Sequence, residues 1–162
     1  MEGLNINLNG FTRLTIASSS GGGKSYLINQ FLKYFKKIGC KMIIVDGKKD
    51  LPAKFAIKHG IKLITNEANK SDDNILSDVC DELSNLNEII TQRQNKLFNN
   101  QVKEDELIPI VLVFDEIGAL TNLASKNVKD NFFKLLTRVA TLGRQAKVHL
   151  LLSSQRFDAN TI

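Results

Sequence analysis

The sequence lacks the features that mark secreted, metal-binding and membrane-spanning proteins. It has only two cysteines among 162 residues, Cys40 and Cys80, and their spacing matches no metal-binding motif. The two histidines, His59 and His149, have no partner at metal or triad spacing, so we expect structural roles for both. No apolar run approaches the roughly 20 residues that a membrane-spanning helix needs, and the N-terminus has no signal-peptide pattern. We therefore expect a cytoplasmic protein whose cysteines are buried free thiols.

What remains is the composition of an ordinary globular protein. Hydrophobic residues make up 43% of the chain and charged residues 24%, which at this length predicts a single domain, residues 1–162. The formal net charge is +5, and many of the lysines lie in the first half. A basic face attracts nucleic acid, but spaced lysines more often form a solvated helix face, so charge alone does not identify a partner.

The most informative motif is the segment from Ala17 to Ser25, ASSSGGGKS. It follows apolar, strand-like residues 14–17 and precedes a helix-like run from Tyr26 to Lys37, as a phosphate-binding loop does. Ser18 stands where the strict pattern G-x-x-x-x-G-K-[ST] has glycine. A flexible Ser/Gly linker is the alternative, but a linker needs neither the strand before it nor the Lys-Ser pair at its end.

This loop predicts a binding site for ATP and Mg²⁺. Consecutive glycines let successive backbone N–H groups point at phosphate oxygens, and the following helix adds its positive N-terminal dipole. We expect Lys24 to contact the β- and γ-phosphates and the Ser25 hydroxyl to bind Mg²⁺. The expected nucleotide-binding residues are Ser20, Gly21, Gly22, Gly23, Lys24, Ser25 and Tyr26.

Short apolar strands alternate with helical patterns along the chain, which predicts an α/β fold with a mostly parallel central sheet flanked by helices. The expected strands are residues 12–17, 41–46, 61–65, 110–115 and 148–153. The expected helices are residues 25–38, 52–60, a long helix from Ser71 or Asp72, and 131–142. Near the N-terminus, Leu4, Ile6 and Leu8 have the period of an additional edge strand.

A second motif is the uninterrupted apolar run from Ile110 that ends in Asp115 and Glu116. Such a run is typical of a strand buried on both faces of a parallel sheet, so its acids emerge at the carboxyl edge, where α/β sheets bind ligands. We expect Asp115 to hold Mg²⁺ through water and Glu116 to polarise the water that attacks the γ-phosphate. Alternatively the two acids only mark the end of a strand.

The segment from Leu142 to Arg156, LGRQAKVHLLLSSQR, is a further apolar strand with polar residues at its end. Together with the loop, residues 44–48 (IVDGK), the Arg93-Gln94 pair and the two acids, it resembles the FtsK/SpoIIIE motor ATPases over nearly the whole chain. Within that family the sequence is most similar to the coupling-type ATPases of conjugative elements. Motors of type VII secretion, which engage proteins, share the same Gly-Arg and Gln-Arg signatures.

The resemblance implies a nearly minimal RecA-like P-loop domain, either a fragment or a reduced form of a larger motor. It implies that Gln155 is a polar sensor of the γ-phosphate and that Arg144 is a finger supplied to the adjacent subunit of a ring. Arg156 is a competing candidate for the finger, and Arg138 ranks below Arg144. Phe157 stands where proline is usual in the family.

The function implied by the resemblance is an ATP-driven motor that moves double-stranded DNA in conjugative transfer or chromosome segregation. Its implied partners are other copies of the chain, arranged as a hexameric ring, and membrane or secretion-channel proteins bound through regions outside this sequence. The alternatives are an ATPase of a type VII-like protein-secretion system, or a nucleotide-binding module without useful turnover.

Overall fold

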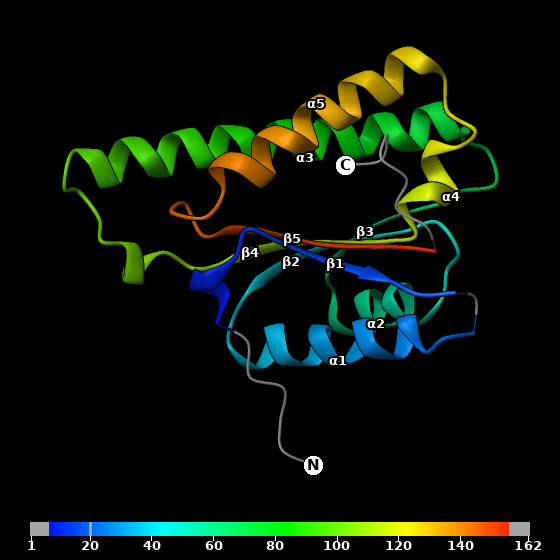
Figure 1. Ribbon diagram of the computed structural model, residues 1–162, viewed down its shortest axis with the longest axis horizontal. Coiled ribbons are helices and arrows are strands. Elements are labelled where there is room, and N and C mark those ends of the chain that lie inside the picture. Colours follow the sequence, from blue (N-terminus) through cyan, green and yellow to red (C-terminus); the bar gives the residue numbers. More distant parts are fainter. Residues whose placement is uncertain (1–6, 20, 156–162) are drawn as a thin grey trace.

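The computed structural model describes residues 7–19 and 21–155, which form one five-stranded sheet with helices on both of its faces (Figure 1). The strands are β1 (Arg13–Ala17), β2 (Lys41–Asp46), β3 (Lys62–Thr65), β4 (Ile110–Asp115) and β5 (Val148–Ser154). The helices are α1 (Lys24–Lys37), α2 (Leu51–His59), α3 (Asp72–Phe98), α4 (Ile117–Thr121) and α5 (Lys126–Leu142). Two short 3-10 helices, η1 (Leu8–Gly10) and η2 (Glu104–Glu106), lie in the connections.

All strand pairs are parallel, and the strand order is β1-β5-β4-β2-β3. The strand that follows α5 is therefore inserted between the glycine-loop strand β1 and the acidic strand β4. Every residue of β4 and β5 is buried, whereas β1 alternates between exposed and partly buried positions. A strand covered on both faces reads as a continuous apolar run, which is why β4 was recognisable from sequence.

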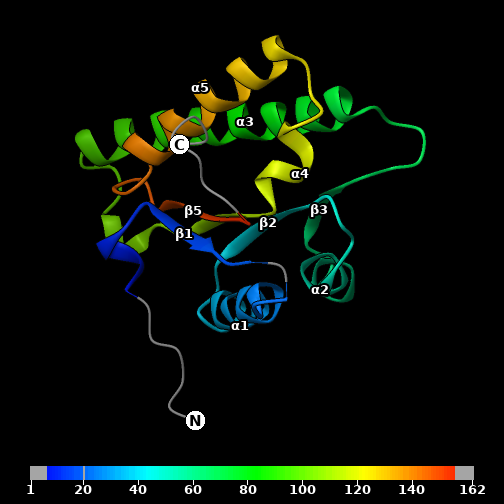
Figure 2. The same cartoon turned by 45° about the vertical axis from the view of Figure 1, so that its right-hand side comes forward.

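Helices α1 and α2 cover one face of the sheet, and α3, α4 and α5 cover the other (Figures 1 and 2). On α1, Ile28, Phe31, Leu32 and Phe35 recur with helical spacing and face the sheet as one buried stripe. The helix ends near Ile38 because Gly39 follows in the left-handed conformation, with φ of 78°. This stripe fixes α1, and so the end of the glycine loop, against the sheet.

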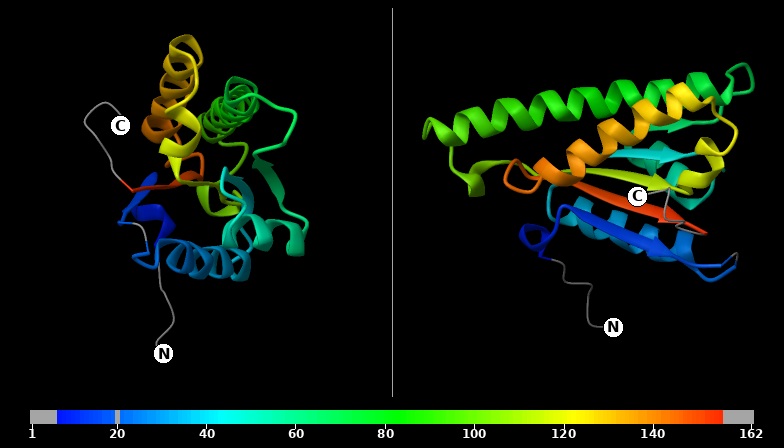
Figure 3. Two further views of the ribbon diagram at one scale, coloured as in Figure 1. Left: turned by 90° about the vertical axis from the view of Figure 1, so that its right-hand side faces the viewer. Right: turned by 45° about the horizontal axis from the view of Figure 1, so that its top comes forward.

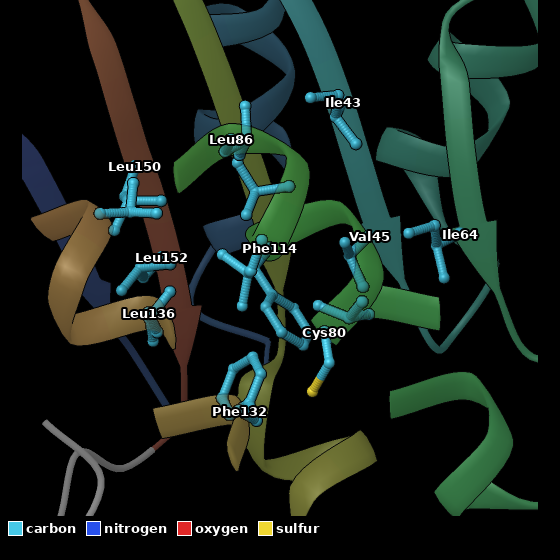
Figure 4. Close-up of a cluster of buried hydrophobic side chains, with 14 of the residues drawn as sticks. Ile43, Val45, Ile64, Cys80, Leu86, Phe114, Phe132, Leu136, Leu150 and Leu152 are labelled. Atoms are coloured by element: carbon cyan, nitrogen blue, oxygen red, sulfur yellow. The ribbon is translucent and has the colours of Figure 1, made fainter. Parts of the chain in front are cut away.

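The larger core cluster lies between the sheet and the pair α3 and α5, which pack along each other (Figure 3). Figure 4 shows the side chains of this cluster, among them Phe114 from β4 and Phe132 from α5. Their ring centroids are 5.6 Å apart at an interplanar angle of 83°, the edge-to-face arrangement that aromatic quadrupoles favour. Cys80 is buried in the same cluster and Cys40 in the other, both as free thiols, as predicted.

The sequence predicted the positions of all five strands to within one residue at each end. It was wrong about Leu8, which lies buried in the 3-10 helix η1 rather than in an edge strand. The Asn7 side chain accepts a hydrogen bond from the Asn9 N–H and thereby closes this turn. Leu4 and Ile6 lie outside the described residues. Helix α5 begins at Lys126, five residues earlier than expected, and the short helix α4 was not predicted.

None of the helices in the described ranges combines the length and the apolar character that crossing a membrane requires.

His149 is fully buried in β5, in agreement with the structural role expected from sequence. Its Nδ1–H donates to the Phe11 carbonyl at 2.9 Å, and its Nε2 has no partner among the described residues. Burial lowers the pKa of this imidazole despite the Phe11 carbonyl, and the charge of Lys147 lowers it further.

We predict that His149 makes folding less favourable in acid. The unfolded chain takes up a proton near its ordinary pKa of about 6.5, whereas the folded chain resists protonation. The free energy of unfolding should therefore fall as the pH drops from 7.5 to 5.5, and His149→Asn, which retains a donor near Nδ1, should weaken that dependence. Urea denaturation across this pH range measures it. His59→Asn, at a less buried site, should retain most of the dependence, and equal slopes in wild type and His149→Asn would contradict the prediction.

Candidate functional site

The carboxyl ends of the parallel strands gather the functional segments at one edge of the sheet. The glycine loop follows β1, Gln155 follows β5, Glu116 follows β4, and Lys48 follows β2 by two residues. Together they border a hollow of about 350 Å³. Its lining residues are Ser19, Gly21, Gly22, Gly23, Lys24, Ser25, Tyr26, Lys48, Asp50, Asp115, Glu116 and Gln155. Such an edge is where open α/β sheets bind ligands.

The described part of the glycine loop has the geometry of an anion cradle. Gly21 and Gly23 have φ of 79° and 77°, a region that residues with a Cβ rarely adopt. Helix α1 begins directly after Gly23, and no described side chain caps this end. Its first N–H groups therefore have no helical acceptor and border the hollow, and they carry the positive end of the helix dipole. Phosphate oxygens would satisfy them.

Ser18, the departure from the strict loop pattern, is accommodated by a neighbouring glycine. A Cβ on Gly22 would collide with the Ser18 hydroxyl and would lie 3.1 Å from the Ser19 carbonyl oxygen. The Gly22 N–H donates to that same carbonyl at 3.1 Å, and the Ser18 hydroxyl donates to it at 3.2 Å. The missing side chain of Gly22 thus provides the space that Ser18 uses.

Asp115 is held rigidly at the end of β4. The Ser153 hydroxyl of β5 donates to Asp115 Oδ1 at 2.6 Å and accepts from the Glu116 N–H at 3.0 Å. Burial raises the pKa of Asp115 in spite of the Ser153 hydrogen bond, and the charge of Asp46 raises it further. A nearby cation would stabilise the ionised form of a carboxylate whose ionisation is opposed in this way. Asp115 and the Ser25 hydroxyl, which line the same hollow, therefore fit an Mg²⁺ ion that keeps several waters.

Glu116 is the most highly connected side chain of the site. One of its oxygens, Oε2, forms an ion pair with Lys24 and lies 3.4 Å from Lys48 Nζ. The other, Oε1, accepts from the Gln155 N–H at 3.0 Å and from the Ser154 hydroxyl at 3.3 Å. Burial opposes ionisation of Glu116, but the hydrogen bonds from Lys24 and Gln155 and the charges of Lys24 and Lys48 outweigh it and lower its pKa.

The backbone of Glu116 is also strained. Its φ and ψ are 59° and 69°, a left-handed conformation that costs a residue with a Cβ about 1 kcal/mol or more. The Ser153 hydroxyl and the start of α4 directly after Glu116 enforce it. Non-glycine residues in such conformations cluster at functional sites, where surrounding contacts pay for the strain.

The structure brings most of the predicted site residues together. Gly21, Gly22, Gly23, Lys24, Ser25, Tyr26, Asp115, Glu116 and Gln155 all line the one hollow. Ser20 and Arg156 lie outside the described residues. Arg144 is not at the site. It is exposed in the turn between α5 and β5, at the opposite end of β5 from Gln155 (Figure 1).

Contacts from α3 and close packing at Gly143 nevertheless hold the turn of Arg144 in a defined shape. Arg93 of α3 donates to the Ala146 carbonyl at 2.7 Å, and Gln94 donates to the Leu142 carbonyl at 3.3 Å. Gly143 leaves no room for a side chain, since a Cβ there would overlap the Val148 and Val139 carbonyl oxygens. The Arg93-Gln94 pair therefore fixes the backbone of the turn that contains Arg144. Sequence analysis noted this pair only through the resemblance.

Sequence analysis missed several contributors to the site, among them Asp46, Lys48, Ser153 and Ser154. Asp46 ends β2 and lies directly beside Asp115 in the strand register. The same argument that placed Asp115 at the sheet edge applied to Asp46 and to the Gly-Lys that follows it. Ser153 was not identifiable, because its role depends on β5 lying next to β4, which no local pattern specifies.

A glycine-rich loop between a strand and a helix, beside two carboxylates at the end of a buried parallel strand, defines a P-loop nucleoside triphosphatase fold. Solved structures confirm this fold class. The pCW3 conjugation coupling protein TcpA with ATPγS superimposes with a TM-score of 0.60 at 19% identity, over 96% of this chain and 46% of that one. EssC ATPases 2 and 3 from Geobacillus thermodenitrificans superimpose with a TM-score of 0.66 at 15% identity, over 96% of this chain and 30% of that one.

The sequence itself is similar to DNA translocases, which confirms the resemblance to FtsK and SpoIIIE. It is 28% identical to DNA translocase SpoIIIE of Bacillus subtilis (strain 168), over 99% of this chain and 22% of that protein. It is 27% identical to DNA translocase FtsK of Listeria monocytogenes, over 99% of this chain and 23% of that protein. The chain thus spans less than a quarter of the length of these relatives. No protein-family model matches the sequence.

We predict that Lys24→Ala weakens nucleotide binding by at least about tenfold, because it removes a cation beside the loop that would neutralise phosphate charge. It also leaves Glu116 without its main ion-pair partner. Titration with a fluorescent ATP analogue measures the effect, with Lys33→Ala as control, an exposed lysine further along α1. Unchanged affinity in a folded Lys24→Ala protein would contradict the phosphate-loop assignment.

Proposed function

We propose that this chain is the ATP-binding and ATP-hydrolysing motor domain of a double-stranded DNA translocase of the FtsK/SpoIIIE type. One observation carries the proposal. Lys24 at the start of α1, Asp115 and Glu116 at the end of β4, and Gln155 after β5 line a single hollow beside the glycine loop. The similarity to SpoIIIE over 99% of the chain supports DNA as the substrate.

The residues divide the chemistry among them. The loop N–H groups and Lys24 bind the phosphates, and the hydroxyl of Ser25 and the carboxylate of Asp115 would hold Mg²⁺, which neutralises developing phosphate charge when bound. Glu116 accepts the proton of the attacking water. The backbone N–H of Gln155 donates a hydrogen bond to Glu116, and its side chain would contact the γ-phosphate. To bind the phosphates, Lys24 must break its ion pair with Glu116, because phosphate and carboxylate compete for the same ammonium group.

Other features of the motor follow from the relatives rather than from this chain. We propose that copies assemble as a ring, hexameric in the full-length protein, that the domain works in the cytoplasm, and that further regions connect it to membrane or secretion-channel partners. The cytoplasmic domain of the Type VII Secretion ATPase EccC of Thermomonospora curvata shares the fold with a TM-score of 0.61, so the same domain would serve a protein-secretion motor as the alternative function.

DNA-stimulated turnover tests the proposed function. Phosphate release from ATP and Mg²⁺ should rise when duplex DNA is added, and Glu116→Gln should bind ATP but lose at least about a hundredfold in turnover, the range that general-base catalysis supplies. Stimulation by a secreted peptide instead of DNA would favour the alternative. Turnover that is absent under all conditions, in a protein that still binds ATP, would reduce the chain to a nucleotide-binding module.

We further predict that Arg144 acts on a neighbouring subunit. Arg144→Ala should leave ATP affinity intact but lower turnover of the assembled protein by about 10³-fold or more, the range of a finger arginine. Mixing it with Lys24→Ala subunits should restore part of the activity, because some interfaces then pair an intact loop with an intact arginine. Lys134→Ala, which removes an exposed cation on α5, is the control. Full activity of an assembled Arg144→Ala protein would contradict the assignment and direct the search to Arg156.

A further inference from the structure

We propose that Lys48 is a second phosphate-binding cation of this site, one that contacts the terminal phosphate and lets the protein distinguish ATP from ADP. The inference rests on the proposed function, because it assigns a ligand contact within the same hollow. It adds a residue from the segment after β2, to which the motifs of the loop and of β4 give no role.

The position of Lys48 is the first argument. Its Nζ lies 3.4 Å from Glu116 Oε2, the same oxygen atom that Lys24 binds. Two ammonium groups thus converge on one carboxylate oxygen, Lys24 from the loop beside β1 and Lys48 from the segment beyond β2. The Lys48 side chain is 47% exposed, against 11% for Lys24, so it has room to move toward a ligand.

The position of Glu116 makes Lys48 specific for the terminal phosphate. For Glu116 to accept a proton from the attacking water, that water must lie between its carboxylate and the γ-phosphorus. The γ-phosphate oxygens would then lie within a few ångström of Glu116. The ammonium group of Lys48 already lies at a similar distance from the Glu116 carboxylate. The β-phosphate would lie against the loop N–H groups and the start of α1. Lys48 therefore meets a group that ATP has and ADP lacks.

The segment that carries Lys48 is fixed, which distinguishes it from an ordinary solvated lysine. The fully buried carboxylate of Asp46 accepts from three backbone N–H groups, those of Lys48 at 2.8 Å, Asp50 at 2.9 Å and Ala53 at 3.0 Å. On the other side, the Asn66 amide donates to the Gly47 carbonyl at 2.8 Å. Burying a carboxylate is costly unless it is hydrogen-bonded, so this clamp holds the backbone of Lys48 in one place. Asp46 is a positioning residue for Lys48.

Charge balance supports the same conclusion. Without a ligand, Lys24 and Lys48 share the single carboxylate of Glu116. When phosphates draw Lys24 away, a lysine that only neutralised Glu116 would stay with it, and would occupy the carboxylate oxygen that the attacking water needs. A Lys48 that follows the γ-phosphate frees Glu116 instead.

Nucleotide preference tests the inference. We expect Lys48→Ala to weaken binding of a non-hydrolysable ATP analogue by about tenfold or more and to change ADP affinity by less than about twofold, since the contact concerns the γ-phosphate alone. Lys48→Arg should retain the preference. Lys49→Ala is the matched control, an adjacent exposed lysine that is not among the lining residues of the hollow as described. Calorimetric titration with both nucleotides and Mg²⁺ gives the four affinities.

The outcomes separate the two proposals. A wild-type protein that binds neither nucleotide overturns the proposed function, and this inference with it. Wild-type binding of both nucleotides with an ATP-to-ADP ratio unchanged by Lys48→Ala overturns only the inference. Equal losses of affinity for ATP and ADP also overturn the inference, because they would show that Lys48 attracts bound phosphate in general and not the γ-phosphate. Lys48 is exposed, so thermal denaturation should show an unaltered fold and leave the comparison interpretable.

Discussion

The pairing of β4 with β5 is the contact on which the site depends. Both strands are buried along their whole length, so a change of register would disrupt the packing on both faces of the sheet. The register places Ser153 where its hydroxyl bonds both the Asp115 carboxylate and the Glu116 N–H. It also places the Gln155 N–H on the Glu116 carboxylate. A core made of aliphatic side chains thereby sets the positions of the groups that would carry out chemistry at its edge.

Much of this arrangement could be predicted from the sequence because it is encoded locally. A glycine-rich loop between strand and helix patterns, and an apolar run that ends in two acids, each need only a few adjacent residues to be recognised. The contribution of Ser153 could not be read in this way, since it depends on which strands become neighbours, whereas Lys48 follows an apolar run and the same local argument applied to it. The short helix α4 has five residues and almost no periodicity. Leu8 fits the period of two that a strand has. The hydrogen bond from the Asn9 N–H to the Asn7 side chain and the burial of Leu8 instead favour a turn.

The location of Arg144 constrains how the molecule could use it. The seven residues of β5 separate the turn of Arg144 from Gln155, a distance of about 20 Å at the rise of an extended strand. A side chain at that end cannot reach the hollow of its own chain. Arg93, Gln94 and Gly143 nevertheless hold the turn in a defined shape at the surface. In the ring proposed above, head-to-tail contacts would bring this end of one copy to the nucleotide site of the next.

The ion pair between Lys24 and Glu116 couples ligand binding to the reactivity of the site. In the structure, Lys24, Gln155 and Lys48 together keep the pKa of Glu116 low, and a carboxylate with a low pKa is a poor proton acceptor. Phosphates compete for Lys24, so their binding removes the main hydrogen bond that lowers this pKa while burial, which raises it, stays in place. In the proposed mechanism, Glu116 would therefore become a stronger base when the substrate is bound. The strained backbone of Glu116 would keep its carboxylate at the position of this exchange.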